Sequence, residues 1–158
     1  GSEIADILTA SDYLKGCAVL SRRYCDHAFS YRSSIYRKTG EIILSATFAM
    51  TPGDSAAIRT LSKKNMTARR EKQPLEYPNA GSIFKRPPCA YAGALIENAG
   101  LKGMRIGGAE VSEKHAGFII NRGGATTDDV LRLIEYIRSD VFKKTGVLLE
   151  PEVIHIPY

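Results

Sequence analysis

Residues 79–87 read Asn-Ala-Gly-Ser-Ile-Phe-Lys-Arg-Pro, and the predicted elements of the chain are arranged around this stretch. Gly81 allows the backbone to adopt a positive φ and to approach a ligand closely. Ser82 carries a hydroxyl that can donate or accept a proton, and Lys85 and Arg86 place positive charge beside it, which suits a phosphate or a carboxylate. Pro87 prevents the strand-like pair Ile83-Phe84 from continuing. The stretch alone indicates an anion site, although a Gly-Ser turn beside surface cations is more often only a turn.

The residues upstream predict a strand, a helix and a domain border. Residues 41–50 are apolar and β-branched almost without interruption, which predicts a strand buried on both faces. A helix is expected from the capping residue Asp54 to about Lys72. The two prolines of Gln73–Pro78 hold the chain out of helix and mark the border between two domains. The apolar residues of the helix recur at helical spacing and are expected to face the core: Ala57, Ile58, Leu61 and Met66.

The residues downstream complete an α+β pattern. Residues 91–100 predict a short helix closed by a glycine, and residues 115–121 predict a second buried strand. Thr126 and Asp129 form a capping-box pattern before a helix that is expected to end at Gly146. One stripe of this helix is expected to lie in the core: Val130, Ile134, Ile137 and Val141. Residues 147–156 predict a last strand, interrupted by a proline and two acids.

Composition excludes several classes of protein. The 158 residues are 44% hydrophobic and 25% charged, as in an ordinary soluble domain, and no apolar run approaches the length of a membrane helix. The first residues lack the pattern of a signal peptide. Three cysteines without CxxC spacing fit reduced thiols in a cytoplasmic protein, and three scattered histidines indicate no metal site. The net charge of +5 is spread in pairs that alternate with acids, which favours solvated faces over nucleic-acid binding.

Six motifs, in this order and spacing, resemble the C-terminal half of the UDP-N-acetylenolpyruvoylglucosamine reductase (MurB) family. The resemblance runs from Glu3 to Ile156 and is closest to the shorter, type II branch. The motifs are Tyr-Arg-x-Ser at 31–34, Gln-Pro-Leu-Glu-Tyr-Pro-Asn-Ala-Gly-Ser at 73–82, Phe-Lys-Arg-Pro at 84–87, Ala-Gly-x-Leu-Ile-Glu-Asn-Ala-Gly-Leu-Lys-Gly at 92–103, Val-Ser-x-Lys-His-Ala-Gly-Phe-Ile-Ile-Asn at 111–121 and Leu-Glu-Pro-Glu-Val at 149–153.

The resemblance implies an architecture and a reaction. Residues 1–77 would be the C-terminal part of an FAD-binding domain, residues 78–146 a small α/β substrate-binding domain, and residues 147–158 a strand that returns to the active site. In the family, NADPH reduces FAD, and the flavin delivers hydride to UDP-N-acetylglucosamine enolpyruvate to give UDP-N-acetylmuramate for peptidoglycan. The N-terminal half of the family, with its glycine-rich FAD-binding loop, has no counterpart in the chain, so the chain alone is expected to hold FAD poorly and to be inactive.

The resemblance also implies residue roles. Ser82 matches the general acid that protonates the carbon next to the carboxylate, and Glu152 matches the active-site glutamate that would order Ser82 or assist proton delivery. Arg32 matches the arginine that polarises the substrate carboxylate beside the flavin. From the residues alone, Arg32 would more simply be a strand-edge arginine in water. Four further residues fall on or near positions that hold the UDP-sugar: Lys72, Arg86, Lys102 and His115.

Three positions depart from the family pattern. Ile154 stands where a basic residue often follows Pro-Glu-Val, Cys89 replaces a common glycine, and Ala94 replaces a common lysine. These departures concern binding contacts and leave the three expected catalytic residues in place. An alternative hypothesis is a non-enzymatic UDP-sugar-binding module that has lost the flavin half. A basic nucleic-acid binder is disfavoured because the chain has no aromatic-rich platform.

Overall fold

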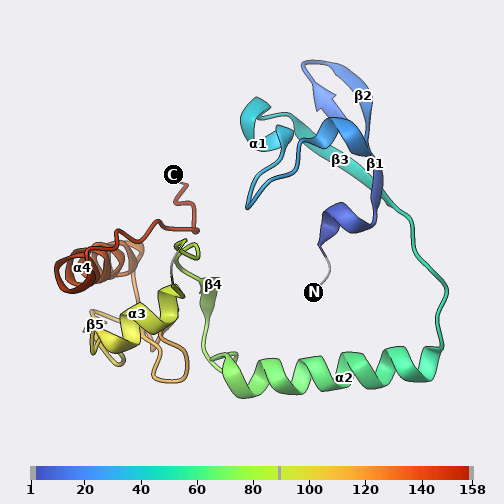
Figure 1. The fold of residues 1–158 in the computed structure, drawn as a ribbon. Coiled ribbons are helices and arrows are strands. Elements are labelled where there is room, and N and C mark those ends of the chain that lie inside the picture. The colour runs from blue at the N-terminus through green and yellow to red at the C-terminus, as the bar shows by residue number, and fades with distance from the viewer. Residues whose placement is uncertain (1–2, 89, 157–158) are drawn as a thin grey trace. The chain divides into compact units, whose positions relative to one another are not determined.

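The structure is a computed structural model that describes residues 3–88 and 90–156. It divides into two compact units, Gly1–Ala57 and Ile58–Tyr158 (Figure 1). The mixture of helices and antiparallel strands in both units is the predicted α+β fold class. The domain border predicted after residue 77 remains a prediction.

The first unit is built on a three-stranded antiparallel sheet in the order β2-β1-β3. The apolar run at residues 41–50 predicted the strand β3. A two-residue turn joins β1 to β2, and Gly16 supplies the left-handed residue that such turns require (φ 58°). The elements of the unit are the 3-10 turns η1 (Ile4–Asp6) and η2 (Tyr24–His27), the strands β1 (Leu8–Lys15), β2 (Ala18–Arg23) and β3 (Ile42–Phe48), and the helix α1 (Ile35–Thr39).

The predicted burial of two elements is wrong. Every residue of β3 is exposed, although the strand was expected to be buried on both faces. The helix α2 (Ser55–Lys72) begins as predicted, and the Asp54 carboxylate accepts a hydrogen bond from the Ala57 N–H at 2.6 Å. Its expected core face is nevertheless exposed, with Ile58 and Leu61 each at 58%. Apolar patterning shows which face can be buried, but burial itself requires a covering layer, and no described residue supplies one.

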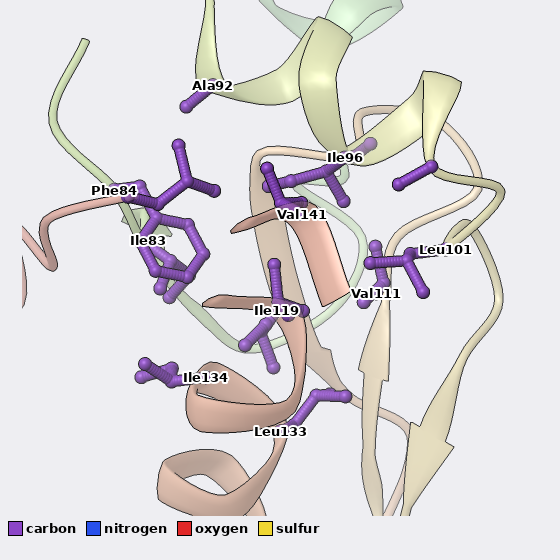
Figure 2. Packing of buried hydrophobic residues seen from close by; sticks show 14 of the residues in the cluster. Ile83, Phe84, Ala92, Ile96, Leu101, Val111, Ile119, Leu133, Ile134 and Val141 are labelled. Carbon is purple, nitrogen blue, oxygen red and sulfur yellow. The ribbon is translucent and has the colours of Figure 1, made fainter. Parts of the chain in front are cut away.

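The second unit packs its helices against a four-stranded antiparallel sheet in the order β4-β7-β6-β5. Its core joins the sheet, both helices and Leu149 in one cluster of buried side chains, part of which is shown in Figure 2. Of the stripe predicted on the long helix, Ile134, Ile137 and Val141 are buried. The elements are the strands β4 (Asn79–Ser82), β5 (Arg105–Ile106), β6 (Ala109–Val111) and β7 (Phe118–Asn121) and the helices α3 (Ala92–Asn98) and α4 (Thr127–Thr145).

The last strand predicted by the sequence does not form. Residues 147–156 contain no strand, and one isolated bridge joins Pro151 to Phe84. The Lys85 N–H donates to the Glu150 carbonyl at 2.9 Å, and the Glu152 N–H donates to the Ile83 carbonyl at 2.7 Å. Pro151 lies between these two hydrogen bonds and is paired with Phe84, and these two residues exchange no backbone hydrogen bond with each other. The N–H that proline lacks is therefore not needed at this position. The segment does return to the stretch at 79–87, as an extended chain paired at two bonds.

The capping box of α4 forms as predicted. The Asp129 N–H donates to the Thr126 hydroxyl at 3.1 Å, and the Thr126 N–H donates to the Asp129 carboxylate at 2.9 Å. The hydrogen bond from the Thr126 N–H is the main reason that the pKa of the Asp129 carboxyl lies below its ordinary value. Gly146 ends the helix in the left-handed conformation (φ 71°).

We expect the Asp129→Asn variant to show a shallower loss of stability in acid than the wild-type protein. Because the folded-state pKa of Asp129 is lowered, its contribution is present above the unfolded-state pKa of about 3.9 and is lost as the pH falls through the folded-state pKa. Urea unfolding between about pH 7 and pH 3 measures this slope. The matched control is Asp128→Asn, since the Asp128 side chain is 74% exposed. Equal pH slopes in the wild type and Asp129→Asn would contradict the assignment.

Candidate active site

A bulge in the edge strand β4 presents Ser82 to solvent. The register with β7 pairs Asn79 with Ile120 and Ser82 with Phe118, so β4 uses one residue more than its partner. Gly81 takes up the resulting turn at φ 79°, and a Cβ at this position would meet no atom within 4 Å. The backbone beside Ser82 is therefore open to a ligand.

The Asn79 side chain fixes the bulge. Its amide nitrogen donates to the carbonyls of Pro74 (3.2 Å) and Tyr77 (2.8 Å), and its amide oxygen accepts a hydrogen bond from the Gly81 N–H (2.9 Å). One side chain thus ties the proline-rich segment to the residue before Ser82. The sequence patterns indicated no role for Asn79, although an asparagine two residues before a glycine is a recognised turn signal.

The residues after Ser82 anchor it in the core. Ile83 and Phe84 are 2% and 4% exposed and point into the cluster in Figure 2. The Ile83 N–H also donates to the Gly117 carbonyl at 2.9 Å. The exposed hydroxyl of Ser82 is therefore carried by backbone that is held by both apolar packing and hydrogen bonds.

Glu152 is brought next to this backbone from the other end of the unit. Its N–H donates to the Ile83 carbonyl, one residue from Ser82, and the residue itself is half-buried. Three contacts hold the returning segment: Leu149 is fully buried, its carbonyl accepts a hydrogen bond from Arg138 Nε at 3.0 Å, and Lys85 forms an ion pair with Glu150. The structure therefore brings the segments that carry Ser82 and Glu152 together.

His115 lies in the connection between β6 and β7 with a defined ring orientation. Its Nδ1 accepts a hydrogen bond from the Gly117 N–H at 3.0 Å, so in the neutral ring the proton is on Nε2. The ring packs edge-on against Phe118 at 4.8 Å. A Cβ at Gly93 would approach His115 Cε1 to 3.2 Å, which shows how closely α3 covers the ring.

The predicted cations of the second unit have different surroundings. Arg86 is exposed, with its guanidinium 4.1 Å from the centre of the Tyr91 ring. Lys102 forms an ion pair with Glu97 at 2.6 Å. Lys72 is exposed on the last turn of α2.

Arg32 belongs to the first unit, where it lies at the tip of a tight turn. The backbones of Ser30 and Ser33 exchange two hydrogen bonds (3.0 and 2.9 Å), which leaves Tyr31 and Arg32 as the central residues. Arg32 has a left-handed backbone (φ 53°), which is uncommon for a residue other than glycine and is found more often at functional sites.

A buried carboxylate that the sequence patterns did not indicate stabilises the four-stranded sheet of the second unit. Glu110 on β6 is 4% exposed, and its Oε2 lies 3.2 Å from Nε of both Arg105 and Arg122. Arg122 also donates a hydrogen bond to the Tyr77 hydroxyl, which connects the sheet to the segment before β4. The short strand β6 was not predicted, because the glutamate at its centre breaks the apolar pattern that indicates a buried strand.

Three expectations from composition concern the cysteines, metal binding and membrane spans. Cys17 and Cys25 are exposed free thiols, while Cys89 lies outside the described part. Across residues 3–88 and 90–156, no group of His, Cys, Asp and Glu side chains is arranged to hold a metal ion. In that same part of the chain, no helix has the length and apolar character needed to cross a membrane.

The fold closely matches the crystal structure of UDP-N-acetylenolpyruvylglucosamine reductase from Thermus caldophilus. The match has a TM-score of 0.81 and 31% sequence identity, and it covers 96% of this chain and 53% of the other. The fold is therefore the α+β fold found in the matched part of that reductase. The family model for the C-terminal domain of UDP-N-acetylenolpyruvoylglucosamine reductase matches residues 73–156. The chain belongs to the UDP-N-acetylenolpyruvoylglucosamine reductase family.

Sequence relatives agree with this assignment. A UDP-N-acetylenolpyruvoylglucosamine reductase from Latilactobacillus sakei is 49% identical over 154 residues, a match that covers 97% of this chain and 51% of the relative. A reductase of the same name from Lachnoclostridium phytofermentans is also 49% identical, with 97% and 50% covered. The chain therefore spans about half the length of the curated relatives it matches.

Proposed function

We propose that this chain, joined to an FAD-binding half in a polypeptide of the relatives' length, catalyses the NADPH-dependent reduction of UDP-N-acetylglucosamine enolpyruvate to UDP-N-acetylmuramate. The reaction would serve peptidoglycan precursor synthesis in the cytoplasm. The observation that carries the proposal is the bond from the Glu152 N–H to the Ile83 carbonyl, because it holds the glutamate segment beside Ser82. Family membership supplies the reaction type.

The proposed chemistry assigns a separate task to each residue. Ser82 would give its hydroxyl proton to the carbon next to the substrate carboxylate, and Glu152 would orient that hydroxyl. Arg32 would bind the carboxylate and stabilise the negative charge that develops on it. The diphosphate and sugar would be held by cations and a ring donor on the second unit: Lys72, Arg86, Lys102 and His115.

The open backbone at Gly81 would leave space for a flat cofactor beside Ser82. The edge strand β4 is largely exposed, and Gly81 leaves its backbone open. FAD bound there would supply the hydride, after reduction by NADPH. The protein would supply the proton, the orientation of the substrate and a cation for its carboxylate.

The proposal is tested by assaying the full-length protein and the 158-residue chain side by side. We expect the full-length protein to purify with a flavin absorbance spectrum and to oxidise NADPH continuously when the enolpyruvyl sugar is present. The chain alone is expected to bind little FAD and to produce no UDP-N-acetylmuramate. A colourless full-length protein that binds the UDP-sugar without turnover would refute the reductase and favour the non-enzymatic binding module.

A further inference from the structure

A buried chain of hydrogen bonds lies in the first unit, outside the proposed catalytic residues. The Ser11 hydroxyl lies 2.7 Å from His27 Nε2 and 2.5 Å from the Tyr36 hydroxyl. All three residues are buried, with exposed fractions of 3%, 1% and 8%. They come from three elements (β1, η2 and α1), so one hydroxyl on the sheet connects two segments that are distant in sequence.

The contacts of His27 give the hydrogen-bond chain one direction. His27 Nδ1 lies 3.2 Å from the Tyr24 carbonyl, which can only accept, so Nδ1 carries a proton. In the neutral ring, Nε2 then accepts from the Ser11 hydroxyl, and the Ser11 oxygen accepts from the Tyr36 hydroxyl. Each buried polar group therefore has a partner of the correct kind, which makes such a network stabilising and specific in geometry.

His27 and Tyr36 are the two ends of the segment that carries Arg32. Residues 28–35 connect His27 at the end of η2 to Tyr36 in α1, with the Ser30–Ser33 turn between them. Two residues of this segment, Ala28 (φ 47°) and Arg32 (φ 53°), have left-handed backbones that only a well-anchored segment retains. The two ends share one hydrogen-bonding partner, because both His27 and Tyr36 contact the Ser11 hydroxyl.

Ring contacts also hold the Tyr36 end of the segment. Tyr36 packs edge-on against Tyr13 at 5.5 Å, and the Arg22 guanidinium lies 4.7 Å from the centre of the Tyr36 ring. Arg22 is itself held by the buried Glu41 carboxylate at 3.0 Å. Removing one hydroxyl from the hydrogen-bond network therefore leaves the ring packing in place. The contribution of the hydrogen bonds can be tested without unfolding the first unit.

We propose that Ser11, His27 and Tyr36 are positioning residues that fix the Arg32 turn through their hydrogen-bond chain. If the network served only to pair its own buried polar groups, it would have no reason to connect both ends of residues 28–35. The proposal deepens the proposed function and rests on the role assigned there to Arg32. The anchoring itself is a property of the first unit and can be measured without any activity.

The first test measures amide hydrogen exchange in Ser11→Ala and Tyr36→Phe. We expect the amides of residues 28–35 to exchange about ten-fold faster than in the wild type, because the segment loses part of its anchor, whereas β1–β3 amides keep their protection. The matched control is Ser45→Ala, which deletes an exposed hydroxyl that donates to Asp12 in the same sheet. Unchanged exchange in residues 28–35, or equal acceleration in the control, would overturn the anchoring.

The second test measures turnover of the full-length protein in a double-mutant cycle. Ser11→Ala is expected to lower kcat about ten-fold, with flavin reduction by NADPH unchanged, because a displaced Arg32 no longer meets the substrate carboxylate. In an Arg32→Ala background, Ser11→Ala should cause no further loss. Additive losses would refute positioning. Wild-type turnover in Arg32→Ala alone would refute the proposed role of Arg32, while the exchange measurement would still decide the anchoring.

Discussion

Ser82→Ala is expected to lower product formation by about 10²- to 10⁴-fold in the full-length protein, the range that loss of a general acid typically costs. Reduction of bound flavin by NADPH should continue at the wild-type rate, because that half-reaction needs no proton from Ser82. The Ser82 side chain is exposed beyond the buried anchor Ile83–Phe84, so its removal leaves the core contacts intact. Rapid-mixing absorbance measurements of the two half-reactions, each followed separately, provide the test.

A matched serine deletion distinguishes the chemical role from a general effect on the protein. Ser139 is an exposed serine on α4, and Ser139→Ala should leave both half-reactions unchanged. Equal slowing of both half-reactions in Ser82→Ala would show that the hydroxyl supports the fold or the cofactor instead of donating the proton. Unchanged product formation would exclude Ser82 as the general acid altogether.

The sequence predicted well the features that depend on local chemistry. Helix α4 has its capping box at Thr126 and Asp129 and its left-handed glycine at Gly146, as predicted, because these signals act within one helical turn. The prediction for α2 was right for its beginning at Asp54 and wrong for its burial. A stripe of apolar residues is a property of the helix, whereas its burial depends on whatever covers it.

The candidate site was predictable only as a set of residues. Ser82 and Glu152 are separated by most of the second unit, and no periodicity indicates that a non-strand segment at 149–153 returns to pair with residues 83–85. Family resemblance selected both residues, but it did not indicate the β4 bulge or the Asn79 contacts that shape the backbone around Ser82. Those features follow from tertiary pairing, which single-sequence patterns do not encode.

The Ser11–His27–Tyr36 hydrogen-bond network could not be predicted from the sequence either, because it also depends on tertiary contacts. Its members are separated by 16 and 25 residues, and each is an ordinary residue in its own local sequence. Only the tertiary fold brings the polar groups of His27 and Tyr36 to the Ser11 hydroxyl. Polar networks in small units are therefore found from structure, even where the fold class is evident from sequence.

Leu133→Ala is expected to lower the free energy of unfolding by about 2–5 kcal/mol, the usual cost of an apolar cavity. Leu133 on α4 is fully buried in the cluster of Figure 2, which also contains Ile83 and Leu149. Because this core holds the backbone next to both Ser82 and Glu152, the cavity should also increase hydrogen exchange at Ile83.

Urea unfolding followed by circular dichroism measures the loss of stability in Leu133→Ala. Leu148→Ala removes the same atoms from a side chain that is 61% exposed and should change stability by less than about 0.5 kcal/mol. Similar losses in both variants would show that burial in this core does not set the stability of the unit.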